Sequence, residues 1–308
     1  MTPNLSKLHI SSARRKISDA VLLRIFHRFP ARSSIFKPSS GRADTEYEVK
    51  GQRAFYWHFG ESAEMFLDKD VLDVGSGFGA SAVRFLEYGA RSVTGLEVTE
   101  DKVNHASSFA IDRGIADRVR FVLGAGESIP LPDGSFDLIT LDDVLEHVVS
   151  PKLTLDECWR VLRPGGRVAL VFPPYYDVLG GSHLSGYATK FPGLNLLFTT
   201  QALRSAVLKN LNERGIDYKP FFREVPTDKL WNLNGLTIRG FRKVLKESPF
   251  RAEKLYYMGH LQYRRDLKHP KASSNPLWRT AYVLAQASAQ VPLIQEAVCS
   301  RVCAVLRK

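Results

Sequence analysis

The stretch from Val71 to Gly79 constrains this chain most, because it joins an apolar run directly to three closely spaced glycines. The apolar residues predict a buried strand over residues 67–74, and residues 80–88 carry apolar side chains at helical spacing. Glycine tolerates positive φ and lets a ligand lie against bare backbone, while a helix start offers unpaired N–H groups. The stretch therefore predicts a strand, a ligand-binding turn and a helix.

The segments that follow alternate between strand and helix patterns. Strands are predicted over residues 92–97, 118–123, 135–141 and 167–172, and helices over residues 99–113 and 151–162. Strands separated by helices imply a parallel sheet whose two faces are both covered. Ligands of such sheets bind at the carboxyl ends of the strands, where the strand order reverses.

Two further features support a nucleoside-like ligand. Glu97 follows the glycines by about 20 residues, at the predicted tip of the second strand, where a carboxylate can accept hydrogen bonds from both ribose hydroxyls. The glycines follow G-x-G-x-G spacing, and Asp73 precedes the first by two positions. This pattern resembles motif I of the class I S-adenosylmethionine (SAM)-dependent methyltransferases. Residues 136–148 and 161–170 resemble the fourth-strand and fifth-strand motifs of the same family.

The resemblance covers roughly residues 68–174 and implies an α/β fold, a Rossmann-like class I methyltransferase sheet with helices on both faces. It implies that the glycines approach the methionyl and ribose parts of SAM, that Asp73 helps hold the amino-acid end, and that Glu97 binds the ribose. Val98 would pack on adenine, and Asp142 would line the pocket. The SAM-binding residues implied in this way are Asp73, Gly75, Ser76, Gly77, Gly79, Glu97, Val98, Gly126, Glu127 and Asp142.

One position departs from the family pattern. The family often places an acid that meets the adenine amino group in the stretch matching residues 124–130, and Ala125 stands there instead. Backbone groups, Glu127 or Ser128 would then hold adenine. His147, which is common at this point of the family, is expected to have a structural role.

The methyl acceptor is expected to bind after the fifth strand. Tyr175 and His183 are the candidate catalytic residues there, because a histidine is the natural general base near neutral pH. Alignment of donor and acceptor without a base is the alternative. Residues 175–235, with a helix predicted at Thr200–Glu213, are expected to form a substrate cap. Their aromatic side chains favour a ring or lipid-like acceptor, or else form the cap's own small core.

The remaining regions flank this core. The predicted division is a basic N-terminal arm and linker (1–45), a SAM-binding core (46–174), the cap (175–235), the end of the core (236–260) and a helical tail (261–308). Residues 18–29 predict a basic amphipathic helix that packs on the core, lies on a membrane or docks on a partner. Residues 278–308 show two helix-length apolar patterns separated at Pro292, in agreement with added C-terminal helices.

Charge is distributed unevenly along the chain. The net charge of +11 divides into +7 over residues 1–60, −8 over residues 61–172 and +12 over residues 173–308. The basic flanks indicate either an anionic partner or a solvated surface. No run of 18 apolar residues is present. The three cysteines form no CxxC pair and no zinc-ligand spacing, so buried, reduced thiols and no metal are expected.

These observations predict a SAM-dependent methyltransferase that acts on a small-molecule or lipid-like acceptor, and O-methylation is the expected reaction. An RNA methyltransferase using the basic flanks, and a SAM-binding protein without catalysis, are the alternatives. We expect a cytoplasmic protein with peripheral membrane contact through residues 18–29 and 276–308. An organelle transit peptide in residues 1–42 is a second interpretation of the arm. The sequence leaves the oligomeric state open.

Overall fold

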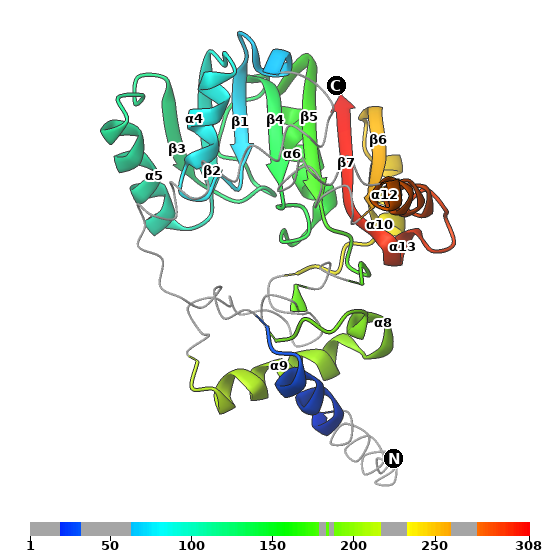
Figure 1. The fold of residues 1–308 in the computed structure, drawn as a ribbon. Coiled ribbons are helices and arrows are strands. Elements are labelled where there is room, and N and C mark those ends of the chain that lie inside the picture. The colour runs from blue at the N-terminus through cyan, green and yellow to red at the C-terminus, as the bar shows by residue number, and fades with distance from the viewer. Residues whose placement is uncertain (1–18, 32–62, 179–182, 185–187, 217–232, 260–275) are drawn as a thin grey trace, which may run out of the picture. The chain divides into compact units, whose positions relative to one another are not determined.

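One seven-stranded sheet organises the larger part of the chain, with the strand order β3-β2-β1-β4-β5-β7-β6 (Figure 1). The computed structural model describes residues 19–31, 63–178, 183–184, 188–216, 233–259 and 276–308. The strands are β1 (Asp70–Val74), β2 (Ser92–Glu97), β3 (Val119–Leu123), β4 (Phe136–Asp142), β5 (Leu162–Phe172), β6 (Arg251–Gly259) and β7 (Cys299–Arg307). The helices are η2 (Ala63–Phe66), α4 (Ala80–Glu87), α5 (Glu100–Asp112), α6 (Pro151–Val161), α8 (Leu194–Leu197), α9 (Thr200–Glu213), α10 (Ile238–Glu247), α12 (Pro276–Ser288) and α13 (Gln295–Val298).

The direction and order of the strands place a ligand site. Strands β1 to β5 run parallel, and β7 pairs antiparallel with both β5 and β6. From β1 the chain builds β2 and β3 on one side and then returns to β4 on the other. The strand order therefore reverses between β1 and β4, which is where doubly wound sheets bind their ligands. The predicted Rossmann-like α/β sheet is confirmed.

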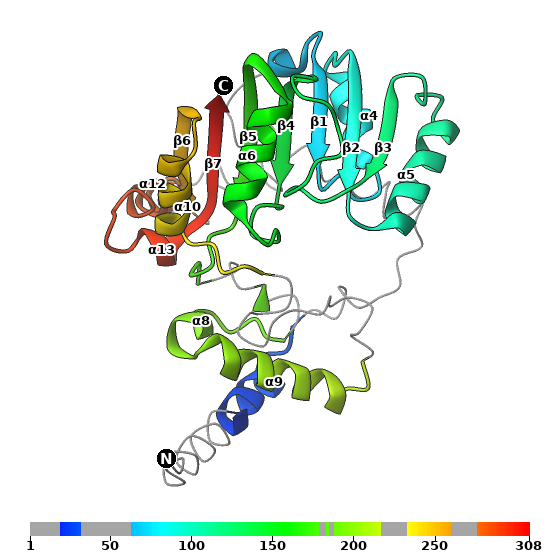
Figure 2. The same ribbon diagram turned by 180° about the vertical axis from the view of Figure 1, so that it is seen from behind.

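Apolar side chains alternate between the two faces of the sheet. On β4, Leu138 belongs to one buried cluster, and Ile139 and Leu141 belong to the other. Helices α6 and α10 cover the face of Ile139, while α4 and α5 contribute to the face of Leu138. Figures 1 and 2 view these two layers from opposite sides. Coverage of both faces explains why the parallel strands are nearly all apolar.

The C-terminal tail contains the main error of the sequence prediction. Residues 276–288 are helical, but residues 299–307 form β7 between β5 and β6, where a second helix pattern was predicted. A short apolar run suits a buried strand as well as a buried helix, so periodicity alone did not separate the two. Cys299 and Cys303 consequently lie in different apolar clusters and share no helical face. Cys158, Cys299 and Cys303 are all buried free thiols.

Two local predictions also need correction. Residues 163–166, which fall between the predicted helix at 151–162 and the predicted strand at 167–172, lie inside β5, where the pairing with β4 shifts register and Gly165 takes φ 78°. This irregularity fits a β-bulge, which accommodates the Pro-Gly-Gly run within the ladder. Thr99, the first residue of the helix predicted at 99–113, stands at the N-cap position of α5, and its side chain forms no capping hydrogen bond.

The chain divides into two compact units. Unit one comprises Met1–Pro38 and Tyr175–Gly235, and unit two comprises Ser39–Pro174 and Leu236–Lys308. The predicted five-part division stays a prediction, except that the helical tail is wrong over residues 299–307.

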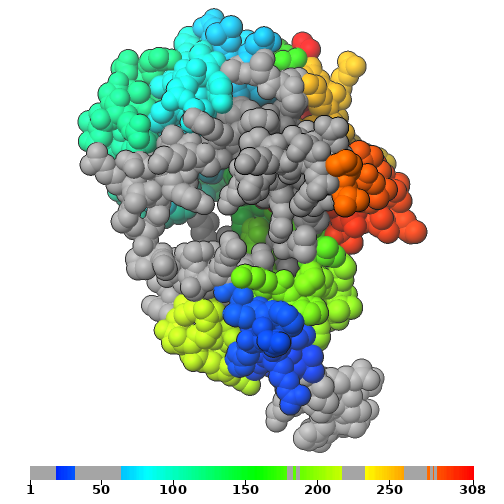
Figure 3. Space-filling view, viewed as in Figure 1, coloured from blue at the N-terminus to red at the C-terminus, as the bar shows by residue number. Residues whose placement is uncertain are grey.

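Unit one has its own apolar core. Leu22 and Phe26, from the helix at residues 19–28, are buried with Leu203 and Val207 of α9. Figure 3 shows residues 19–31, in blue, against green and yellow-green residues of the same unit. The apolar face of this helix is therefore used in packing. The predicted cap helix at Thr200–Glu213 matches α9, and residues 217–232 of the predicted cap lie outside the described residues.

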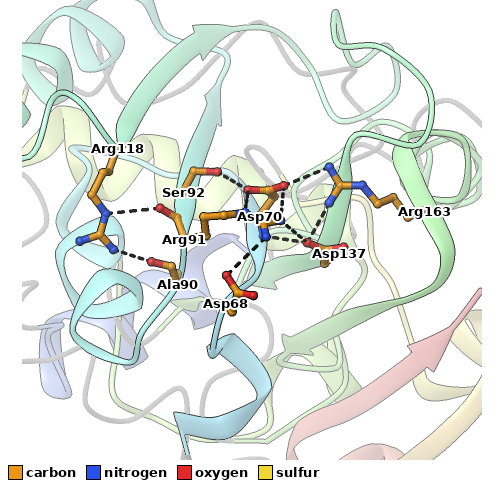
Figure 4. Close-up of polar contacts among 8 residues, drawn as sticks. All are labelled: Asp68, Asp70, Ala90, Arg91, Ser92, Arg118, Asp137 and Arg163. Atoms are coloured by element: carbon orange, nitrogen blue, oxygen red, sulfur yellow. Dashed lines mark hydrogen bonds and ion pairs between the residues drawn. The ribbon is translucent and has the colours of Figure 1, made fainter.

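An ion-pair network connects the amino ends of β1, β2 and β4 (Figure 4). Arg91 donates to both oxygens of Asp70, at 2.9 and 2.6 Å. Arg163 lies 3.0 Å from Asp70 and 2.8 Å from Asp137. These hydrogen bonds hold the pKa values of both carboxyl groups below their usual range. The network fixes the sheet at the edge opposite the carboxyl ends of these strands.

Among the residues that the structure describes, no helix combines the length and apolar character needed to cross a bilayer.

Candidate functional site

The glycine-rich loop connects the carboxyl end of β1 to α4. Gly75, Gly77 and Gly79 adopt φ values of 74°, 55° and 86°. These values lie in the left-handed region, which favours glycine. The N–H groups of Gly75 and Ser76 both donate to the carbonyl of Leu96, at 2.8 and 3.1 Å. The loop is therefore fixed to the neighbouring strand β2.

The three glycines are required for different reasons. A Cβ at Gly75 would lie 2.5 Å from Val144 Cγ2, and one at Gly79 would lie 2.6 Å from Phe121 Cζ. These two glycines permit close packing of the loop on its neighbours. A Cβ at Gly77 would meet no atom of the described residues within 4 Å. Open space beside a backbone with positive φ is what a ligand lying against the loop needs.

Glu97 ends β2 and faces this loop with a buried carboxylate. Its Oε2 accepts a hydrogen bond from the Gly77 N–H at 3.2 Å, and its Oε1 accepts from Val98 and Thr99 at 3.0 Å each. A carboxylate has about four acceptor positions, so one remains for a ligand hydroxyl. The predicted ribose-binding position is thus adjacent to the open surface of Gly77.

Asp73 is buried beneath the loop. Its Oδ2 accepts from the Ser81 hydroxyl, and its Oδ1 accepts from the Thr140 hydroxyl at 2.7 Å. Burial raises the pKa of Asp73 to about 6, although both hydrogen bonds oppose the shift. Each oxygen of Asp73 therefore already has a protein partner, which suits a residue that positions the loop.

Ser76 is a polar residue of the glycine-rich loop. Its Oγ is buried and has no hydrogen-bond partner among the described residues. This Oγ lies toward β2, because a Cβ at Gly95 would be 2.6 Å from it. The fit to the ribose end of SAM therefore depends on the open space beside Gly77 and on the Glu97 carboxylate.

The groups expected to hold adenine have different surroundings in the structure. The Glu127 carboxylate accepts hydrogen bonds from the Val149 and Ser150 N–H groups, so it stabilises the segment that leads into α6. Ser128 is exposed. Gly126 is buried close to Thr154, and a Cβ there would lie 3.1 Å from that side chain. Backbone groups are thus the best remaining candidates for adenine contacts, and Val98, half exposed, remains available to pack on the base.

A cluster of acids follows β4, and sequence analysis identified only its first member, Asp142. Asp143 adopts φ 53° and lies 3.3 Å from Arg301 of β7. Glu146 is buried, and its Oε1 lies 3.7 Å from the His147 imidazole. Burial raises the pKa values of Asp142 and Glu146 well above their ordinary range. The spacing Asp-Asp-x-x-Glu-His after a buried strand was the available sequence signal.

The two predicted catalytic residues belong to unit one. The Tyr175 hydroxyl lies 2.9 Å from Thr200 Oγ1, and its ring is part of the apolar core of that unit. Burial raises its pKa, so the phenol is held neutral. His183 is half buried and adopts φ 56°. The catalytic roles of both residues stay predictions, as do the SAM contacts assigned above.

Comparison with known proteins identifies the core. A family model described as a methyltransferase domain matches residues 72–170. YcgJ of Bacillus subtilis, described as an uncharacterized methyltransferase, is 39% identical over 111 residues, covering 36% of this chain and 43% of that protein. Sterol 24-C-methyltransferase ERG6B of Gibberella zeae is 38% identical over 96 residues, covering 31% and 25% respectively.

A third relative is the ubiquinone/menaquinone biosynthesis C-methyltransferase UbiE of Methylobacterium nodulans. It is 38% identical over 112 residues, which cover 36% of this chain and 44% of that protein. The chain thus matches less than half the length of each relative. The matched residues contain the glycine-rich loop, Glu97 and the acids after β4. Residues 72–170 therefore match a methyltransferase domain, in agreement with the resemblance to the class I SAM-dependent family.

Proposed function

We propose that this protein transfers the methyl group of SAM to a small-molecule or lipid-like acceptor. The observation that carries the proposal is the open space beside Gly77, whose N–H group donates to the buried Glu97 carboxylate. When bound, SAM supplies a methyl group already activated by its sulfonium. The protein's contribution is then to hold donor and acceptor in line and to exclude water.

The relatives support a lipid-like acceptor. Two of them are named for sterols and for ubiquinone and menaquinone biosynthesis. For the acceptor atom we propose oxygen, because methylation of a hydroxyl requires only removal of its proton, for which this chain has carboxylate and imidazole groups. Both relatives are named C-methyltransferases, so the bond formed in the product decides this point.

The first experiment separates binding from catalysis. Calorimetry with SAM should show one site per chain, and Glu97→Ala should weaken it. Incubation with methyl-labelled SAM, a lipid extract and total RNA should then place label in the lipid fraction. Binding without any transfer would favour a non-catalytic SAM-binding protein, and label in RNA would favour an RNA methyltransferase. Mass spectrometry and NMR of the product would identify a new O–CH3 or C–CH3 bond.

We also propose that unit two contacts membranes through residues 277–294, consistent with a lipid-like acceptor. No charged residue occurs between Arg279 and Glu296. Leu277 and Leu293 are 79% and 93% exposed, and Val283, Leu284, Val291 and Ile294 are also exposed. Figure 3 shows residues 276–298, in orange to red, at the surface of unit two. Apolar side chains of this kind insert at the boundary between lipid headgroups and acyl chains.

Basic residues border this apolar surface. Glu296 of α13 accepts hydrogen bonds from the first N–H groups of α10, at 2.9 and 2.8 Å. Arg242 of the same helix donates to Gln295 Oε1 at 2.9 Å, so the exposed residues Arg239 and Arg242 lie near residues 291–296. An apolar surface with adjacent cations suits an anionic membrane.

The membrane proposal is tested by flotation with vesicles of phosphatidylcholine and phosphatidylglycerol. Leu293→Asp should reduce the vesicle-bound fraction several-fold, and added salt should weaken binding of the unaltered protein. Ile111→Asp on α5 is the matched control, because Ile111 is exposed elsewhere in unit two. Equal vesicle binding by the two variants would contradict the assignment of residues 277–294.

A further inference from the structure

Glu146 is an unusual side chain for the interior of a protein. It is 2% exposed, and neither of its carboxylate oxygens has a hydrogen-bond partner among the described residues. An unpaired buried carboxyl group costs free energy that folding does not recover. Such a group in a native structure indicates a partner that arrives with a ligand.

The position of Glu146 places it beside the methyl-donor site of unit two. It lies four residues after the end of β4, in the turn that begins at Asp143. Val144 of the same turn packs directly over Gly75, where a Cβ would lie 2.5 Å from Val144 Cγ2. The turn that carries Glu146 therefore contacts the glycine-rich loop at the point where the strand order reverses.

Burial is the largest cause that raises the pKa of Glu146, and the charges of Asp143 and Asp142 raise it further. The backbone of Glu146 itself and Arg301 lower it in part. The His147 imidazole lies 3.7 Å from Oε1, beyond hydrogen-bond distance. A carboxylate whose pKa is raised takes up a proton more readily than an ordinary one, which suits general acid–base catalysis.

Three other acids at this edge of the sheet, Asp73, Glu97 and Asp143, have partners. Both oxygens of Asp73 accept hydroxyl hydrogen bonds, Glu97 accepts three backbone hydrogen bonds, and Asp143 is exposed and paired with Arg301. Glu146 is different because it is buried and, within the described part of the chain, both of its oxygens remain available.

We propose that Glu146 takes up the proton of the methyl acceptor during transfer. This role rests on the proposed function. As the acceptor atom forms its bond to the methyl carbon, the carbon–sulfur bond breaks and leaves its electron pair on sulfur. The proton that the acceptor loses passes to the Glu146 carboxylate and then to solvent. Glu146 is thereby a catalytic residue that the sequence prediction of His183 and Tyr175 does not include.

The test compares Glu146→Gln and Glu146→Asp with a matched control, Glu87→Gln on the exposed end of α4. Calorimetry measures SAM affinity, and infrared difference spectroscopy follows the protonated carboxyl band of Glu146 with pH. Methyl transfer is measured with labelled SAM and two probes, catechol and a short-chain prenylated hydroquinone, over pH 5–9. SAM affinity should stay within about twofold for all variants. Transfer by Glu146→Gln should fall about 100-fold or more, the usual range for loss of a general base.

The pH dependence distinguishes a base from a structural group. The rate for the unaltered protein should rise as the Glu146 carboxyl ionises, at the pH where the infrared band disappears. Glu146→Gln should lose both the rise and the band, and Glu146→Asp should recover part of the rate. Transfer by Glu146→Gln within threefold of the unaltered protein, with the same pH profile, would overturn the role of Glu146 alone. SAM binding without transfer to any acceptor by the unaltered protein would overturn the proposed function as well.

Discussion

Glu97 Oε2 accepts a hydrogen bond from the Gly77 N–H at 3.2 Å, so the acid at the tip of β2 holds the loop that follows β1. The same carboxylate fixes the start of α5 through the N–H groups of Val98 and Thr99. One side chain therefore links both strands that border the ligand position. Its removal should affect ligand binding and the order of the loop together.

Glu97→Gln should weaken SAM binding about tenfold or more, equivalent to about 1.4 kcal/mol. The amide keeps one acceptor oxygen but directs an NH2 group toward backbone N–H donors, so part of the network is lost. Calorimetry measures the change. Glu100→Gln, in the exposed first turn of α5, is the control and should bind SAM like the unaltered protein. Equal SAM affinities of Glu97→Gln and Glu100→Gln would show that the Glu97 carboxylate does not contribute to SAM binding.

Gly75→Ala should abolish measurable SAM binding and destabilise unit two, because the new Cβ would lie 2.5 Å from Val144 Cγ2 at a residue with φ 74°. Gly114→Ala is the matched control, since Gly114 has φ 65° and a Cβ added there would meet nothing within 4 Å. It should cost only the backbone strain, roughly 1–2 kcal/mol. Urea unfolding and calorimetry compare the two. Similar losses in both variants would show that the Val144 contact is unimportant.

The free energy of unfolding of unit two should depend on pH because of the Asp73 carboxyl group. Its pKa is about 6 in the folded state and about 3.9 in an unfolded chain. The folded state therefore binds this proton more tightly, and the group's contribution to stability falls as pH rises from about 4 to about 6. The loss should be about 3 kcal/mol. Asp73→Asn should abolish this slope, so the variant's stability relative to the unaltered protein should improve over that interval in urea titrations.

Carboxyl groups with lowered pKa values, such as Asp70 and Asp137, produce the opposite trend at lower pH. The diagnostic quantity is consequently the difference between the two proteins at each pH. A constant difference from pH 4 to pH 7 would be inconsistent with a raised pKa at Asp73.

Asp70→Asn should destabilise unit two by about 1–2 kcal/mol, a small value because Arg91 is half exposed and solvent screens the pair. Asp70 has a lowered pKa in the folded state. Its stabilisation is present above about pH 4 and is lost as pH falls through the folded pKa. SAM affinity should be unchanged, because the Asp70 network closes the opposite edge of the sheet. Weaker SAM binding by this variant, measured by calorimetry under folding conditions, would contradict that separation.

The sequence alone identified the part of the protein whose signals are local. The G-x-G-x-G run, the acid at the end of β2 and the alternation of strands and helices predicted the sheet and the position of the donor site. These signals are readable because turn chemistry and hydrophobic periodicity depend on neighbouring residues. The bounds of β2 and α9 were predicted to the residue for this reason.

Tertiary structure decided what depends on residues far apart in the chain. Residues 299–307 are a strand because they pair with β5 and β6, and an apolar run alone does not specify such a partner. Glu127 is engaged by backbone groups more than twenty positions away. Glu146 lacks a hydrogen-bond partner among the described residues, and it was recognised as a candidate catalytic residue only from its burial and hydrogen bonding in the structure. Local pattern determined the elements, but the pairing of strands and the satisfaction of buried polar groups are set by the folded chain as a whole.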